Sequence, residues 1–210
     1  MKKAVKNVSF IFLLLKMCFI FSQEGSIQKR IVLDPGHGGK DFGAIAINGL
    51  KEKDLVLDVA LEIIKLNAQS ETPLDIYLTR YNDTLISLSD RTKLARALKA
   101  DLFISLHCND ALNSNARGIE VYTSRSVFGF SDSSVWFAYR LQKNIKRQLG
   151  FESRGVKFAD FQVIREVNGL CPVVLLELGF LSNADERSYL VEKQHMERIA
   201  SVLLSSIINH

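Results

Sequence analysis

The sequence lacks the features that mark several protein classes. Beyond residue 22 it contains no internal repeat, no linker, no low-complexity stretch and nothing that resembles a coiled-coil seam. Its composition, 47% hydrophobic and 24% charged residues, is ordinary for a globular protein and excludes a disordered chain. Because 210 residues are enough to bury most of the apolar surface in one core, we expect a single domain.

An excess of basic charge is also absent outside the first 22 residues. That segment holds four of the chain's 27 Lys and Arg residues and none of its 23 Asp and Glu residues. The rest of the chain is therefore formally neutral, although the whole sequence carries a charge of +4. Since no basic stripe remains, we expect no nucleic-acid partner.

The first 22 residues have the pattern of an export signal. Three lysines precede an apolar run over residues 8–21 that only Ser9 and Lys16 interrupt, and the chain then turns polar. This pattern predicts a secretory signal peptide over residues 1–22. The run is too short, and its charge too near the middle, for a transmembrane helix. We therefore expect a periplasmic or secreted protein that contacts the membrane only through the signal peptide, before cleavage.

Cysteine is scarce, with three residues in the chain. Cys18 lies inside the apolar run, so we do not expect it to carry a lipid anchor. Cys108 and Cys171 remain after cleavage, and an oxidising compartment would permit a disulfide between them. Two separate buried thiols are equally consistent with the sequence.

Hydrophobic patterning predicts strands that alternate with helices. Apolar runs predict strands at residues 30–33, 74–79, 102–106, 118–122, 161–164 and 173–178. Helical spacing predicts helices over residues 53–66, 87–98, 133–149 and 194–208, and Asn183 with Glu186 predicts the start of a short helix. This order indicates an α/β fold, a single domain with a mostly parallel or mixed sheet, helices on both faces and a site at the carboxyl ends of the strands.

Two histidines occur where such a fold places a site. His37 follows the first predicted strand within Asp34-Pro-Gly-His-Gly-Gly, and His107 follows the strand at residues 102–106. The glycines around His37 would let the backbone approach a ligand or metal closely. His195 and His210 fall late in the chain, where we expect them to be solvated.

A catalytic zinc site usually combines two histidines and a carboxylate with one position open for water. Glu52 stands just before the first predicted helix and is a natural third ligand, but Asp54 and Asp41 are close in sequence. Acidic residues are also common at helix N-termini because they interact favourably with the helix dipole. The residues by themselves leave this choice open.

Glu177 interrupts an otherwise apolar run at the end of the last predicted strand. A carboxylate there must reach water or be paired, and burial would shift its pKa toward the range of a general base. A buried salt bridge to Arg80 or Arg91 is the alternative. We favour catalysis, because perturbed carboxylates concentrate at functional sites.

Four motifs, in this order, resemble the zinc-dependent N-acetylmuramoyl-L-alanine amidases. They are Ile31-Val-Leu-Asp-Pro-Gly-His-Gly-Gly, Gly49-Leu-Lys-Glu-Lys-Asp, Ser105-Leu-His-Cys-Asn and Leu176-Glu-Leu-Gly-Phe-Leu-Ser-Asn. The segments at residues 78–83, 88–91 and 154–157 match as well, and the resemblance runs from about residue 31 to residue 208.

The resemblance implies that residues 30–210 form a zinc amidase catalytic domain. It implies that His37, Glu52 and His107 hold one Zn²⁺ and that Glu177 is the catalytic carboxylate. The implied reaction is hydrolysis of the amide bond between N-acetylmuramic acid and L-alanine in peptidoglycan, in cell-wall remodelling or daughter-cell separation. Cys108 departs from the family, in which a small residue such as alanine usually follows this histidine, and it could tune or compete for the metal.

The sequence also suggests two substrate-binding residues and the absence of an activator protein. Asn109 and Arg80 are candidate substrate-binding groups beside the site. Between residues 121 and 150 the chain has room for one ordinary helix and not for an additional blocking helix, so we expect an open cleft that needs no activator protein. The alternatives are an exported zinc amidase or peptidase with another substrate, and a peptidoglycan-binding protein without turnover.

Overall fold

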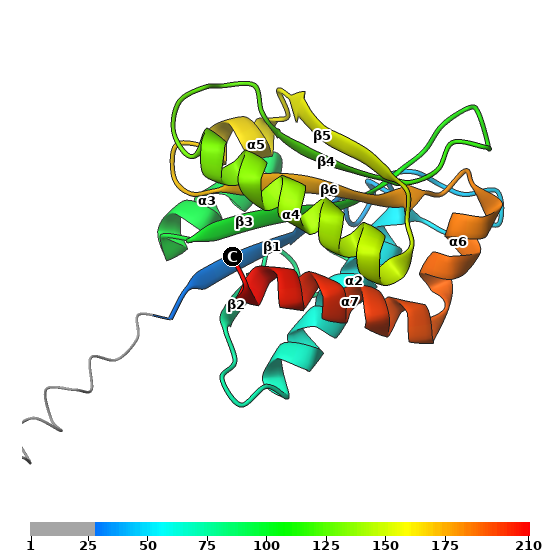
Figure 1. Cartoon of the computed structure of the whole chain (residues 1–210), viewed down its shortest axis with the longest axis horizontal. Coiled ribbons are helices and arrows are strands. Elements are labelled where there is room, and N and C mark those ends of the chain that lie inside the picture. Colours follow the sequence, from blue (N-terminus) through cyan, green and yellow to red (C-terminus); the bar gives the residue numbers. More distant parts are fainter. Residues whose placement is uncertain (1–27) are drawn as a thin grey trace, which may run out of the picture.

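A mixed six-stranded sheet forms the centre of the computed structural model, which describes residues 28–210 (Figure 1). The strands are β1 (Arg30–Pro35), β2 (Asp75–Leu78), β3 (Leu102–Asn109), β4 (Ile119–Ser124), β5 (Ser153–Ala159) and β6 (Val173–Phe180). They lie in the order β2-β1-β3-β6-β4-β5. All neighbours are parallel except β4 and β6, which are antiparallel. The predicted signal peptide lies outside the described residues.

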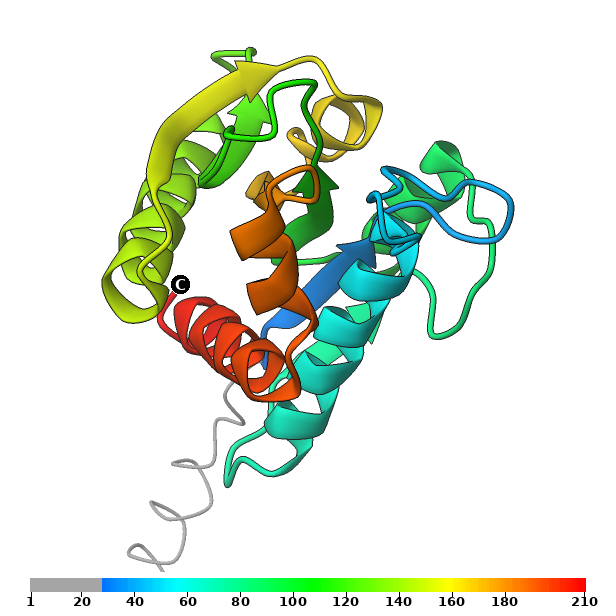
Figure 2. The ribbon, with the colours of Figure 1, turned by 90° about the vertical axis from the view of Figure 1, so that its right-hand side faces the viewer.

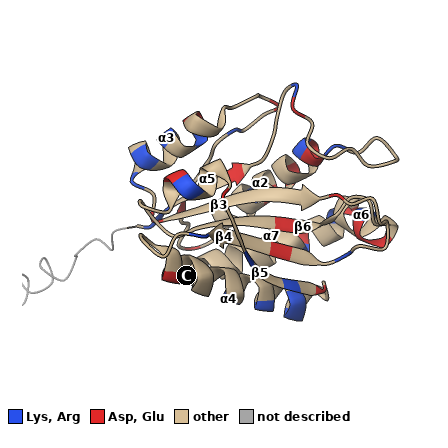
Figure 3. Cartoon of the chain, turned by 90° about the horizontal axis from the view of Figure 1, so that it is seen from above, with Lys and Arg blue, Asp and Glu red and all other residues tan. Residues whose placement is uncertain are grey.

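Helices cover both faces of this sheet, which confirms the predicted fold class. They are α2 (Glu52–Ala68), α3 (Leu88–Leu98), α4 (Ser131–Leu149), α5 (Gln162–Val167), α6 (Ala184–Val191) and α7 (Lys193–Ile208). The apolar sides of α2, α4 and α7 share one core cluster with one face of the strands. The second cluster packs α5 and the end of α3 against the other face. Figure 3 shows α3 and α5 on one side of the strands and α4 on the other.

The helix boundaries follow local chemistry that the sequence predicts. The Ser87 hydroxyl accepts the backbone N–H of Asp90 at the start of α3, and the Asn183 side chain accepts two backbone N–H groups at the start of α6. Helix α4 is capped at its C-terminus by Gly150, whose φ of 80° is left-handed and suits glycine. None of the helices in residues 28–210 combines the length and apolar character needed to cross a bilayer.

The strand predicted at residues 161–164 is wrong, because this segment begins helix α5. Val163, Ile164 and Val167 share one helical face and bury it in the second core cluster. A short apolar run cannot distinguish a buried strand from a buried helical turn. The sequence pattern also gives no sign of β5, since this edge strand is mostly exposed and has no continuous apolar run.

Strands β1, β3 and β6 are mutually parallel where they adjoin, so their carboxyl ends meet at one edge of the sheet. Figure 2 views this side of the molecule, with the loop between β1 and α2 in light blue beside the end of β1. The sheet thus brings together three segments that are far apart in sequence.

Candidate active site

The loop after β1 turns sharply and is held by two arginines. His37 has a left-handed φ of 59°, which is unfavourable for a residue with a side chain. Arg80 donates hydrogen bonds to the carbonyls of Pro35 (3.0 Å) and Gly36 (2.8 Å), and Arg91 donates to those of Pro35 (2.8 Å) and His37 (2.6 Å). Because three successive carbonyls are bound, the loop is over-determined and the strained conformation persists.

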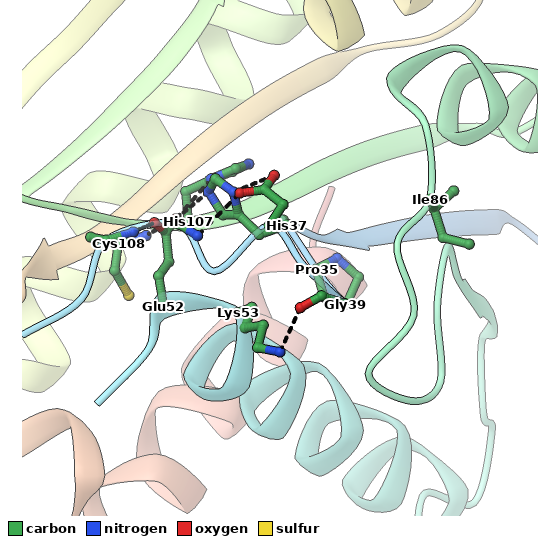
Figure 4. Close-up of polar contacts among 12 residues, drawn as sticks. Pro35, His37, Gly39, Glu52, Lys53, Ile86, His107 and Cys108 are labelled. Atoms are coloured by element: carbon green, nitrogen blue, oxygen red, sulfur yellow. Dashed lines mark hydrogen bonds and ion pairs between the residues drawn. The ribbon is translucent and has the colours of Figure 1, made fainter. Parts of the chain in front are cut away.

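His37, Glu52 and His107 converge at the carboxyl ends of β1 and β3 (Figure 4). Glu52 Oε1 lies 3.1 Å from His37 Nε2 and 2.9 Å from His107 Nδ1. One ligand atom from each of the three residues lies within 4.8 Å of the others. The backbone N–H groups of Cys108 and Ala44 donate to the two oxygens of Glu52, at 3.0 and 2.8 Å, and so orient the carboxylate.

The geometry separates the three acidic candidates. Glu52 reaches both histidines, whereas Asp54 is exposed on the first turn of α2. Asp41 instead pairs with His37 Nδ1 at 2.9 Å, which leaves Nε2 facing Glu52. Burial by itself would lower the pKa of His37, but Glu52 and Asp41 outweigh it and raise that pKa. Burial opposes ionisation of Glu52, yet the hydrogen bonds from His107 and His37 hold its pKa far below the usual range.

Two glycines make room for these side chains. A Cβ added to Gly36 would lie 2.3 Å from His107 Cε1, and one added to Gly43 would lie 2.4 Å from Glu52 Oε2. Both distances are far inside van der Waals contact. The imidazole and the carboxylate therefore occupy space that only glycine leaves open.

Glu177 lies on β6 directly beside His107 of β3 in the strand register. Its Oε2 is buried and has no hydrogen-bond partner among residues 28–210. Burial raises the pKa of Glu177 to about 7; His107 works against this shift, and Glu52 and Glu120 add to it. The alternative of a salt bridge is not observed, because the Arg91 guanidinium pairs with Asp34 (2.6 Å) and that of Arg80 binds backbone carbonyls.

The raised pKa of Glu177 predicts a pH-dependent cost in stability. The folded protein keeps a proton on this carboxyl up to a pKa of about 7, above the ordinary value of 4.5. Stability from Glu177 is therefore present below pH 4.5 and lost as pH rises through 7. With the metal removed by a chelator, we compare the free energies of unfolding of Glu177→Gln and the wild type. The advantage of the variant is expected to grow by up to about 3 kcal/mol from pH 5 to pH 8. Urea unfolding at both pH values measures these free energies. A difference between variant and wild type that is the same at both pH values would contradict the prediction. Glu71→Gln, at an exposed position, is the control.

The two candidate substrate-binding residues are not among those that line the cleft beside the histidines. Arg80 is 3% exposed, and its guanidinium donates hydrogen bonds to carbonyls of the loop after β1 and to that of Lys53 in α2. It therefore positions the loop. The Asn109 side chain donates to Glu120 (2.9 Å). His195 was expected to be solvated, but it stacks on Tyr189 with 3.8 Å between ring centroids.

Two buried carboxylates beside the site were not among the site residues predicted from the sequence. Asp34 accepts hydrogen bonds from Arg91 (2.6 Å), Thr79 (2.7 Å) and Ser105 (2.7 Å) beneath the site. Glu120 lies on β4 directly opposite Glu177. Glu120 could have been found by the signal that singles out Glu177, a carboxylate within an apolar strand.

A cleft of about 460 Å³ opens over His37, His107 and Glu177. Its opposite wall is largely apolar and comes from the segment at residues 85–88 and from the start of α5. Leu85, Leu88 and Phe161 on this wall are 41–49% exposed. The cleft can thus hold an extended molecule with both apolar and polar parts.

Cys108 points away from the histidines into the core on the α2 side of the sheet, where it is 4% exposed. Burial raises the pKa of its thiol well above the ordinary value, which disfavours the thiolate that binds metals. Cys171 is buried in the cluster on the other face of the sheet, and neither cysteine forms a disulfide within residues 28–210. The two thiols are thus separate core residues.

An α/β domain with a His-Glu-His group and a buried carboxylate at the strand ends has the layout of a metal-dependent hydrolase. The chain belongs to the N-acetylmuramoyl-L-alanine amidase family, whose sequence pattern matches residues 31–209.

Relatives of known name place the chain in the same family. It is 35% identical over 185 residues to the N-acetylmuramoyl-L-alanine amidase LytC of Bacillus subtilis (strain 168), covering 88% of this chain but 36% of LytC. The catalytic domain of CwlV, an N-acetylmuramoyl-L-alanine amidase from Bacillus (Paenibacillus) polymyxa var. colistinus, has a TM-score of 0.77 at 37% identity and covers 86% of this chain and 97% of that domain. The CwlD amidase from Clostridioides difficile, solved in complex with the GerS lipoprotein, has a TM-score of 0.77 at 27% identity, with coverage of 86% and 97%.

Proposed function

We propose that this chain is a zinc-dependent hydrolase that cleaves the amide bond between N-acetylmuramic acid and L-alanine in peptidoglycan. The observation that carries the proposal is the placement of Glu177 beside the His37-Glu52-His107 group, with a buried oxygen that has no partner within residues 28–210, in the cleft that His37 and His107 line. The family and the relatives support the same bond. We expect the protein to act outside the cytoplasm, in the periplasm or after secretion.

The three residues fit one zinc ion. Two imidazoles and a carboxylate are the donors that Zn²⁺ commonly takes in catalytic sites. Asp41 Oδ2 lies 2.9 Å from His37 Nδ1, so a carboxylate faces the ring nitrogen that points away from Glu52. Gly36 and Gly43 leave the space that His107 and Glu52 need. We therefore assign His37, Glu52 and His107 as the residues that would hold the ion.

Replacing Gly36 by alanine is expected to weaken zinc binding by about 10- to 100-fold, because its Cβ would displace the His107 ring. Competition with a chelating dye measures the affinity. Gly169→Ala is the matched control, since a Cβ there meets nothing within 4 Å. Equal affinities in the two variants would show that the ring tolerates the methyl group.

The mechanism follows from the residues around the cleft. Zinc supplies Lewis-acid chemistry when bound, polarising the amide carbonyl and making water a better nucleophile near neutral pH. Glu177 takes the proton from the attacking water, because its buried carboxylate has an oxygen with no partner among residues 28–210 and burial raises its pKa toward the range of a general base. It then gives that proton to the nitrogen of the departing L-alanine. The two arginines that bind the β1 loop hold His37 in place throughout.

We expect the cleft to need no activator protein. The described chain between β4 and β5 holds one helix, α4, which packs into the core and contributes no residue to the cleft lining. Because the related CwlD was solved with a lipoprotein, the test uses the purified chain alone.

Digestion of purified peptidoglycan, followed by mass spectrometry of the products, tests the proposal. Release of stem peptides that begin at L-alanine is the expected result. Cleavage at another bond would indicate a different amidase or peptidase. Intact strands with zinc bound would indicate a binding protein without turnover or a requirement for a partner.

A further inference from the structure

Two basic side chains of the edge strand β5 contact Glu120, which lies on β4 beside Glu177. Arg154 Nε donates to Glu120 Oε1 over 2.7 Å, and Lys157 Nζ donates to the same oxygen over 2.5 Å. The Glu120 side chain is 4% exposed, whereas those of Arg154 and Lys157 are 41% and 35% exposed. One buried carboxylate thus holds two half-exposed cations, one more positive charge than Glu120 alone neutralises.

Aromatic rings support both cations. Arg154 Cζ lies 5.1 Å from the centroid of the Phe180 ring, and Lys157 Nζ lies 5.9 Å from that of Tyr122. The Tyr122 hydroxyl donates to the other oxygen of Glu120 at 2.7 Å. Because rings and carboxylate together limit the motion of both side chains, the two cations are pre-organised.

The cations keep hydrogen-bond donors that the protein does not use. Arg154 uses Nε on Glu120 and Nη1 on a backbone carbonyl, and its Nη2 has no acceptor among residues 28–210. Within the described part of the chain, Lys157 uses one of its three N–H donors. A single cation would neutralise Glu120. The second cation and the unused donors therefore suit the binding of an anion from outside the chain.

The strand register places these cations near the reaction centre. Glu120 lies directly opposite Glu177, so their Cβ atoms are about 5 Å apart. Lys157 lies opposite Tyr122, which points to the same face of the sheet as Glu120, and the next strand is about 5 Å further away. Figure 3 shows acidic positions on the central strands with basic positions close to them. The charged heads are thus within about 10 Å of Glu177.

We propose that Arg154 and Lys157 form a carboxylate subsite for the stem peptide, which rests on the proposed function. The subsite binds the α-carboxylate of the residue that follows L-alanine. From the scissile nitrogen, one Cα–Cα step leads to this carboxylate over roughly 6 Å, a span that fits the distance from Glu177. Phe161 of the cleft lining packs on Tyr122, the ring beside Lys157, with 5.3 Å between centroids, so the two cations adjoin the cleft at Phe161 without lining it. The apolar wall at residues 85–88 is left for the sugar side of the bond.

Two synthetic muropeptides test this subsite, identical except that this α-carboxylate is free in one and amidated in the other. The wild-type protein is expected to favour the free carboxylate by about tenfold in kcat/KM, the effect of one charge-assisted hydrogen bond, and to do so mainly through KM. Arg154→Gln and Lys157→Gln are each expected to bring this preference toward one. Arg154→Lys keeps the charge and should retain part of the preference. Lys143→Gln on α4, an exposed position outside the subsite, should keep all of it.

The preference ratio separates recognition from structural support, because a role in holding β5 would lower both rates alike. Equal use of the two substrates by the wild type, or an unchanged preference in both glutamine variants, overturns the subsite. Parallel loss of both activities in folded variants, checked by circular dichroism, also overturns it. Failure of the wild type to cleave either substrate contradicts the proposed function itself, and the subsite with it.

Discussion

Glu177→Gln is expected to lower the rate of peptidoglycan hydrolysis by about 10²- to 10⁴-fold, the usual contribution of a general base. Glutamine has nearly the same shape but cannot take a proton from water. A general base must be ionised, and burial raises the pKa of this carboxyl whereas bound zinc would lower it, so wild-type activity should also rise with pH between pH 5 and pH 8. A dye-release assay on labelled peptidoglycan, run across this range, measures both effects.

Zinc content distinguishes loss of the base from loss of the site. The Glu177→Gln protein should bind one zinc per chain, as the wild type should, because Glu177 is not one of the three proposed ligands. Glu71→Gln, at an exposed position, should change neither quantity. A variant at Glu177 that keeps wild-type rates would exclude this residue as the base.

Glu52→Ala is expected to lose tight zinc binding and to reduce activity by more than about a hundredfold. Glu52 contacts both histidines and accepts two backbone N–H groups, so its removal leaves His37 and His107 without the group that joins them. A chelator should have the same effect on the wild type, and added zinc should restore activity only there. Elemental analysis and the digestion assay measure the two losses.

Asp54→Ala supplies the matched control. This carboxylate lies on the same first turn of α2 but is exposed. Its removal should leave both metal content and activity unchanged. If Glu52→Ala retained one zinc per chain, or if chelation left the wild-type rate unaltered, the assignment of these ligands would be wrong.

Several parts of the fold follow from local sequence alone. The continuous apolar runs of β1, β3 and β6 exist because these strands are buried on both faces, and the pattern is visible without a structure. The caps at Ser87, Asn183 and Gly150 are equally local. The assignment at residues 161–164 fails because burial against the second cluster, and not local pattern, selects a helix there.

Some site residues also follow from local sequence, whereas others do not. His37, His107 and Glu177 are recognisable because each interrupts or ends a buried strand with a group that needs a partner. The choice of Glu52 over Asp41 and Asp54 depended on the family resemblance, since all three are carboxylates within one short segment.

The sequence alone determined the α/β class, the order of most elements and three residues expected at the reaction centre, and its family resemblance added Glu52. Only the tertiary structure decided that Asp41 supports His37, that Arg80 lies beneath the loop, and that Glu120 faces Glu177 with two cations beside it. The physical reason is distance along the chain. Apolar periodicity and caps arise between residues a few positions apart, whereas these contacts depend on strand register and on how loops fold back over the sheet.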